Sequence, residues 1–162
     1  MTTAMQPTLL ACAASLVMAL LLTLVPLPVW AALARPSFYA ATVLFWALYL
    51  PRHFGVIAAW CCGLFLDASY AAPLGQYALA LALASFVVIK MRGLLWVLPP
   101  LQQAIALLPA LLLYEFVLFW IDGVSGRGTD PLWRWLPVLS TAAIWPLWSA
   151  CLERLVEIEV KS

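Results

Sequence analysis

Charged residues are scarce in this sequence. Only 9% of the 162 residues are Asp, Glu, Lys or Arg, whereas 67% are hydrophobic. Soluble domains have about 25% charged and about 45–50% apolar residues. The composition therefore indicates a membrane protein. The net charge is +1 and the basic residues stand singly along the chain, which disfavours nucleic acid as a partner.

Motifs for catalysis and metal binding are also missing. The sequence contains no GxSxG, HExxH, P-loop or paired-aspartate motif. The sole histidine, His53, stands beside Arg52 at a predicted turn, and the four cysteines lie in apolar runs without CxxC spacing. We therefore expect no enzymatic activity, no metal site and no cofactor.

Six apolar runs account for most of the chain. A membrane-spanning helix needs about 20 apolar residues, with a range of roughly 17–25. The runs cover residues 9–25, 37–50, 54–72, 76–89, 101–121 and 132–152. The second and fourth are short, so the range is five to seven spans and the expected number is six. The expected fold is an all-α integral membrane protein, with residues 1–162 forming a single polytopic membrane domain.

Basic residues near the helix ends predict the orientation in the membrane. With the N-terminus inside, more basic residues fall on the cytoplasmic side than on the outer side. The cytoplasmic set is Arg52, Lys90, Arg92, Arg154 and Lys161, and the outer set is Arg35, Arg127 and Arg134. This weak bias favours cytoplasmic N- and C-termini.

The third run contains a stripe of small residues that ends at an acid. Gly55, Ala59, Gly63 and Asp67 are spaced by four, so they lie on one helix face. Small residues at that spacing let another backbone approach closely, as in membrane helix packing. We predict that Gly55, Ala59 and Gly63 form a packing surface for another membrane helix.

A charged Asp67 is energetically unfavourable in this apolar run. A charged aspartate at a bilayer centre costs about 2.5–3.5 kcal/mol and usually has a partner in the protein or water. One interpretation is an inward-facing acid that bonds a neighbouring helix or organises the following turn. Pro73 ends the helix there, Gly75 can adopt a positive φ angle, and the freed amides need acceptors. The other interpretation is an acid near the interface that caps local backbone and reaches water.

Glu115 is the second unusual acid. It follows Tyr114 in a long apolar run, and Asp122 lies seven residues on, on nearly the same helix face. No basic residue lies within one helical turn of Glu115. A proton relay, a structural hydrogen bond and a position nearer the membrane surface remain open interpretations.

Two motifs resemble a known family over residues 36–155. They are Gly63…Asp67 followed by LGQYAL at 74–79, with Gly75 and Gln76, and WIDG at 120–123, with Trp120 and Asp122. The sequence resembles the bacterial rod shape-determining MreD family. The resemblance implies a non-enzymatic inner-membrane subunit of the machinery that elongates the cell wall. It also implies a six-helix fold similar to the substrate-binding component of energy-coupling-factor transporters. The implied partners are the bitopic protein MreC, the actin-like MreB, the glycosyltransferase RodA and a class B penicillin-binding transpeptidase.

Two functions follow as hypotheses. The first is a scaffold that binds the helix of an MreC-like partner through the small-residue stripe. The alternative is a component that binds a small molecule or membrane lipid, which predicts a pocket between the helices lined by Asp67 and Glu115.

Overall fold

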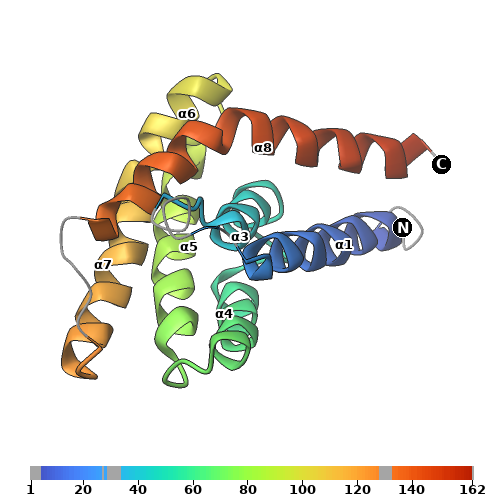
Figure 1. Cartoon of the computed structure of the whole chain (residues 1–162). Helices are drawn as coiled ribbons and strands as arrows, with labels where there is room; N and C mark the ends of the chain where they lie inside the picture. Colours follow the sequence, from blue (N-terminus) through green and yellow to red (C-terminus); the bar gives the residue numbers. More distant parts are fainter. Residues whose placement is uncertain (1–4, 27, 29–33, 128–132, 162) are drawn as a thin grey trace.

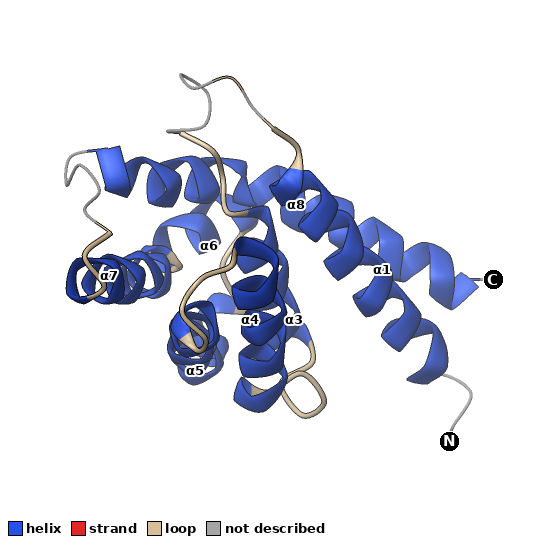
Figure 2. Ribbon diagram, turned by 60° about the horizontal axis from the view of Figure 1, so that its bottom comes forward, coloured by secondary structure: helices blue, strands red, loops and turns tan. Residues whose placement is uncertain are grey.

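Helices form all the regular structure in the described residues, which are 5–26, 28, 34–127 and 133–161 of the computed structural model. Figure 1 shows the arrangement of the helices, and Figure 2 shows no strand among these residues. The helices are α1 (Met5–Leu24), α3 (Phe38–Tyr49), α4 (Val56–Tyr70), α5 (Gln76–Leu95), α6 (Pro100–Ala106), α7 (Leu108–Val124) and α8 (Leu136–Lys161), with a 3₁₀ turn, η1 (Trp133–Trp135), before α8.

The core is built around α3. Its residues from Tyr39 to Leu48 are all buried, and it contacts α1, α4, α5 and α8. A helix that is apolar on every side is expected to be surrounded in this way. The hydroxyl of Thr42 donates to the Phe38 carbonyl and accepts from the indole N–H of Trp148 on α8, at 3.0 Å in the second bond. The buried hydroxyl of Thr42 is therefore paired both as a donor and as an acceptor.

The predicted fifth apolar run is broken in two. The structure divides it into α6 and α7, which meet at an angle of 40°. Pro109 lies in the first turn of α7, and a proline there has no N–H to donate and crowds the carbonyl four residues earlier. The break at Leu107 follows from this residue. Pro146, by contrast, lies inside α8, which continues past it.

The structure does not support six membrane spans. Among the described residues, Gln76–Leu95 and Trp133–Val156 are long and apolar enough to cross a membrane, and α6 with α7 would make a third span. Two other apolar helices are shorter: α3 has 12 residues and α4 has 15, or about 18 and 22 Å. A hydrocarbon core is about 30 Å thick. The chain is an all-α membrane protein, in which two or three spans meet these criteria within the described residues.

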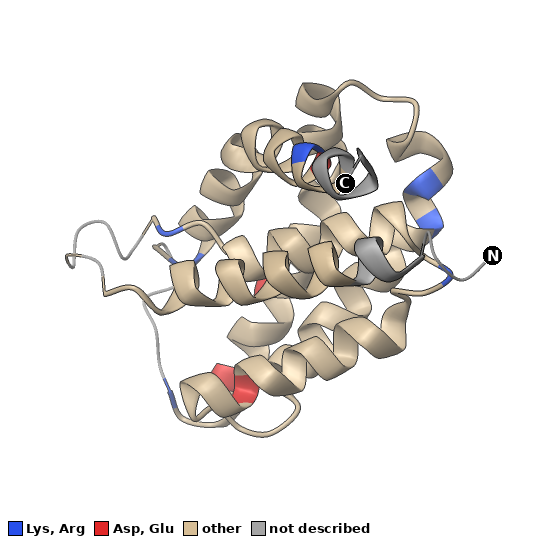
Figure 3. Ribbon diagram, turned by 90° about the vertical axis from the view of Figure 1, so that its right-hand side faces the viewer, with Lys and Arg blue, Asp and Glu red and all other residues tan. Residues whose placement is uncertain are grey.

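Most of the basic residues lie away from the middle of the helices. In Figure 3 most Lys and Arg segments lie toward two opposite margins of the ribbon, with long uncharged stretches between them. At one end, Arg35 and Arg134 line the same cavity. Elsewhere, Arg52 and Arg92 line another hollow together with His53. These four arginines thus form two separate pairs.

Candidate functional site

The small-residue stripe of α4 packs within the chain. A Cβ atom placed on Gly63 would lie 2.2 Å from the Cα of Ala78 on α5, so only glycine allows this backbone approach. Ala59 is completely buried, and Gly55, at the start of α4, is half-buried. The prediction that a partner's helix packs on this stripe is wrong at Gly63, because α5 of the same chain already occupies that place.

Asp67 caps the start of α5. The residue is only 1% exposed. Its two carboxylate oxygens accept hydrogen bonds from the backbone amides of Gly75, at 2.9 Å, and Tyr77, at 2.7 Å. The first amides of a helix have no partner within the helix, and a carboxylate there is favoured by the helix dipole. Asp67 therefore organises the turn into α5.

The turn itself uses two left-handed residues. Ala71 ends α4 with φ of 48°, and Gly75 precedes α5 with φ of 99°. Pro73 lies between them and accepts a hydrogen bond from the Gln76 amide at its carbonyl oxygen, at 3.1 Å. Glycine adopts positive φ without the steric cost that other residues bear. This backbone geometry brings the amides of α5 within reach of Asp67.

Gln76 connects α5 to α7. The residue is 3% exposed, and its side-chain amide donates to Asp122 at 2.8 Å. Asp122 lies in the last turn of α7, which continues to Val124, so the WIDG motif at residues 120–123 is helical. Trp120, from the same motif, is 64% exposed and takes no part in this contact.

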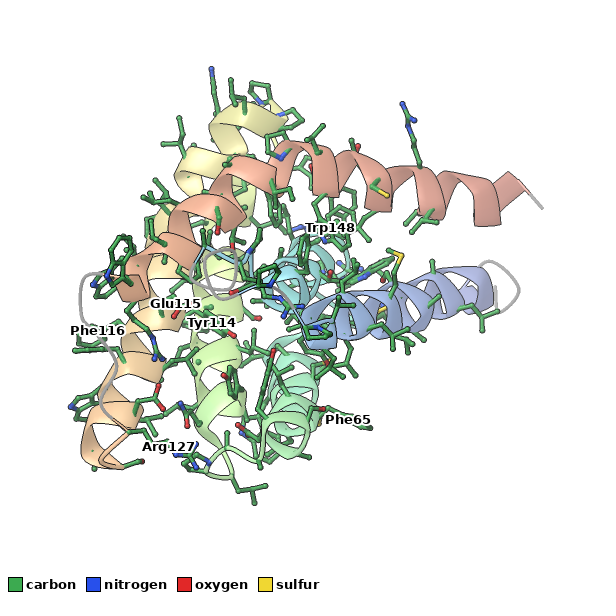
Figure 4. All side chains as sticks on the ribbon, in the orientation of Figure 1. Phe65, Tyr114, Glu115, Phe116, Arg127 and Trp148 are labelled. Atoms are coloured by element: carbon green, nitrogen blue, oxygen red, sulfur yellow. The ribbon has the colours of Figure 1, made fainter. Side chains whose placement is uncertain are left out.

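Arg134 of η1 joins the two acids of α7. Its guanidinium donates to Asp122 at 2.6 Å, and its Nε lies 3.5 Å from a Glu115 oxygen. Glu115 is 6% exposed, and Figure 4 shows it with Tyr114 on the inner side of α7, while Phe116 points away. Sequence reasoning missed this pair because Arg134 comes from another element. The feature of the sequence that could have indicated this pair is Arg134 itself, a single arginine between two tryptophans.

These contacts define a buried polar cluster. It consists of Asp67, Gln76, Glu115, Asp122 and Arg134. Four elements contribute to it, namely α4, α5, α7 and η1. Within the described part of the chain, no group of three or more His, Cys, Asp or Glu side chains could hold a metal ion. The cluster's groups instead cap a helix and pair with one another.

A cavity of about 300 Å³ adjoins the buried polar cluster. Glu115, Asp122 and Arg134 line it, so a pocket between the helices does exist beside one of the two predicted acids. Asp67 is not among its lining residues, because its carboxylate is turned to the amides of α5. The hypothesis of a pocket lined by both Asp67 and Glu115 is therefore wrong for Asp67.

A family model described as rod shape-determining protein MreD matches residues 4–154. The chain belongs to the MreD family. Membership implies a role in determining rod shape. No solved structure matches the chain, so that comparison does not support the expected similarity to an energy-coupling-factor component.

Most positions that suggested the MreD family meet at one junction of the fold. Gly63 sets the approach of α4 to α5, Asp67 and Gly75 form the turn between them, and Gln76 and Asp122 join α5 to α7. Trp120 is the exception, on the exposed side of α7. The motif residues of this MreD chain thus position helices with respect to one another.

Proposed function

We propose that this MreD chain is a non-enzymatic membrane scaffold in the machinery that inserts peptidoglycan into the lateral cell wall. The family match over residues 4–154 carries this proposal. The environment of the acids also supports it, because Asp67 caps a helix and Asp122 bonds to both Gln76 and Arg134. Carboxylates engaged in this way serve to fix helices in place.

The direct partner in this proposal is MreC, with RodA, a class B penicillin-binding transpeptidase and MreB in the same assembly. Since α5 covers Gly63, the MreC helix must bind elsewhere. Two outward apolar faces of the chain are candidates: Ile57 and Phe65 on α4, and Phe116 and Trp120 on α7. Figure 4 shows Phe65 and Phe116 pointing away from the helices, on different sides.

We further propose that residues 1–162 form one multi-pass domain of the inner membrane, with both termini in the cytoplasm. Arg35 and Arg134 lie in a different hollow from Arg52 and Arg92, and the larger number of basic residues in the set that contains Arg52 and Arg92 favours the cytoplasm for that set. Reporter fusions after residue 53 and after residue 127 test it. We expect cytoplasmic activity at the first position and periplasmic activity at the second, and the reverse pattern would contradict the orientation.

Depletion in the native rod-shaped cell tests the scaffold role. We expect rods to become spheres, MreC to co-purify with the tagged wild-type chain, and Gly93→Ala, at an open position on α5, to restore both. Replacing Ile57 and Phe65 by Ala, or Phe116 and Trp120 by Ala, should identify the MreC-binding face by loss of co-purification. If depleted cells stay rod-shaped and no MreC is recovered, the scaffold proposal fails.

A further inference from the structure

We propose that the cavity beside the buried polar cluster binds the zwitterionic headgroup of a phospholipid, whose acyl chain lies in the groove between α1 and α4. This goes beyond the scaffold role and does not depend on it. The cavity's volume of about 300 Å³ is at the lower end of the roughly 300–1,000 Å³ typical of small-ligand sites. Three observations on the lining residues support the proposal.

The first observation is a pair of tyrosine hydroxyls without protein partners. Tyr77 and Tyr114 line the cavity, and neither hydroxyl bonds to any residue that the structure describes. Tyr114 is only 3% exposed, and Figure 4 shows it on the inner side of α7. Both hydroxyls reach the open space of the cavity, since neither is among the inaccessible unpaired atoms of the described residues, and each has room for a hydrogen-bond partner there. A ligand in the cavity would supply it.

The second observation is the unequal pairing of the charged groups in the lining. Arg35 donates to the Leu22 carbonyl oxygen, its Nε is buried without a partner, and no described acid forms an ion pair with it. It lies near Tyr70. Glu115 and Asp122, near Tyr77, share the guanidinium of Arg134. The cavity thus has one cation, Arg35, without a paired acid in the described residues, and two acids that share the guanidinium of Arg134.

This arrangement fits a ligand that carries both charges. Guanidinium groups bind phosphate oxygens through charge-assisted hydrogen bonds. Carboxylates and the faces of aromatic rings attract an ammonium group. Arg35 would therefore hold the phosphate, and Glu115 with the tyrosines would face the ammonium. A purely anionic headgroup would meet Arg35 but would also face Glu115 and Asp122.

The third observation is an apolar groove next to the cavity. A second hollow of about 350 Å³ lies between α1 and α4 and is lined by residues such as Leu20, Cys62 and Phe65. Tyr39 lines both spaces, and the cavity's Thr23 and Leu66 lie on the same two helices as the groove. An amphipathic molecule would fill both, whereas a free zwitterion would leave the groove empty. Membrane lipid is the class of ligand that this shape favours.

Native mass spectrometry of the full-length chain tests the proposal, with phosphatidylethanolamine and phosphatidylglycerol of identical acyl chains as probes. We expect wild type to retain more phosphatidylethanolamine than phosphatidylglycerol. Arg35→Gln should weaken the binding of both lipids. Glu115→Gln should remove the preference between them. Tyr114→Phe, which deletes only the hydroxyl, should reduce retention without changing the helical content measured by circular dichroism.

A matched pair of variants tests the groove. Val17→Trp places a large side chain in it and should reduce lipid retention, whereas Leu112→Trp, on an outward position of α7, should not. Equal retention of the two lipids by wild type would overturn the zwitterion assignment. Competition by free phosphoethanolamine as strong as by the whole lipid would overturn the groove assignment. Unchanged retention in both Tyr114→Phe and Val17→Trp would overturn the site.

Discussion

The two sides of α5 pack by opposite means. Toward α4, the contact depends on a missing side chain, because Gly63 lets the backbones meet at Ala78. Toward α7, it depends on specific polar atoms, because Gln76 bonds to Asp122, which Arg134 also holds. An added atom would therefore disrupt the contact with α4, whereas the loss of a hydrogen-bonding partner would disrupt the contact with α7. Asp67 joins the two sides, since it lies on α4 and caps α5.

Gly63→Ala should have the largest effect on stability, and Gly63→Leu should prevent folding. The added Cβ would lie 2.2 Å from Ala78 Cα and 2.5 Å from its amide nitrogen, and these backbone atoms cannot turn aside. Overpacking a core typically costs about 1–3 kcal/mol, and a backbone clash should exceed that range. Unfolding midpoints in mixed detergent micelles measure the loss. Gly93→Ala, with open space around it, is the control, and equal midpoints for the two variants would contradict the packing described.

Asp122→Ala should have the second-largest effect on stability. It leaves Arg134 without its closest carboxylate and Gln76 without its acceptor. Removing one partner of a buried ion pair costs about 3–5 kcal/mol, and the lower end applies here because both side chains keep some exposure. A double-mutant cycle with Arg134→Ala isolates the pair. If the two losses simply add, the pair contributes nothing and the contact with Gln76 alone accounts for the effect.

Asp67→Ala should destabilise the α4–α5 turn by a smaller amount. Each unpaired buried amide costs about 1–3 kcal/mol, but the Gly75 and Tyr77 residues are only half-buried, so water can replace part of the loss. Asp67→Asn keeps one carbonyl oxygen and should lose less than Asp67→Ala. Hydrogen exchange at the Gly75 and Tyr77 amides is the local measurement. Unchanged exchange in Asp67→Ala would show that the cap is not the source of protection.

The sequence predicted some of these contacts because they are local. Asp67 and the Gly75 amide that it caps are only eight residues apart, and a proline and a glycine follow the acid in this short segment. The pairing of Glu115 with Arg134 joins different elements, and no spacing rule indicates it. The stripe at Gly63 indicated that a helix packs there, but the pattern carries no information on which chain supplies the helix. The break of the fifth apolar run at Leu107 was missed because a continuous apolar run does not show that Pro109 starts a new helix there.

Gly75→Ala should have the smallest effect of the four. The backbone there has φ of 99°, and a left-handed conformation costs a residue with a Cβ roughly 1–2 kcal/mol. No atom lies within 4 Å of the added methyl group, so strain is the whole cost. Gly123→Ala is the matched control, since that glycine is helical and has equally open surroundings. It should be neutral or stabilise by about 0.5–1 kcal/mol. Opposite signs in the two unfolding midpoints would identify conformation, rather than space, as the reason for glycine at the start of α5.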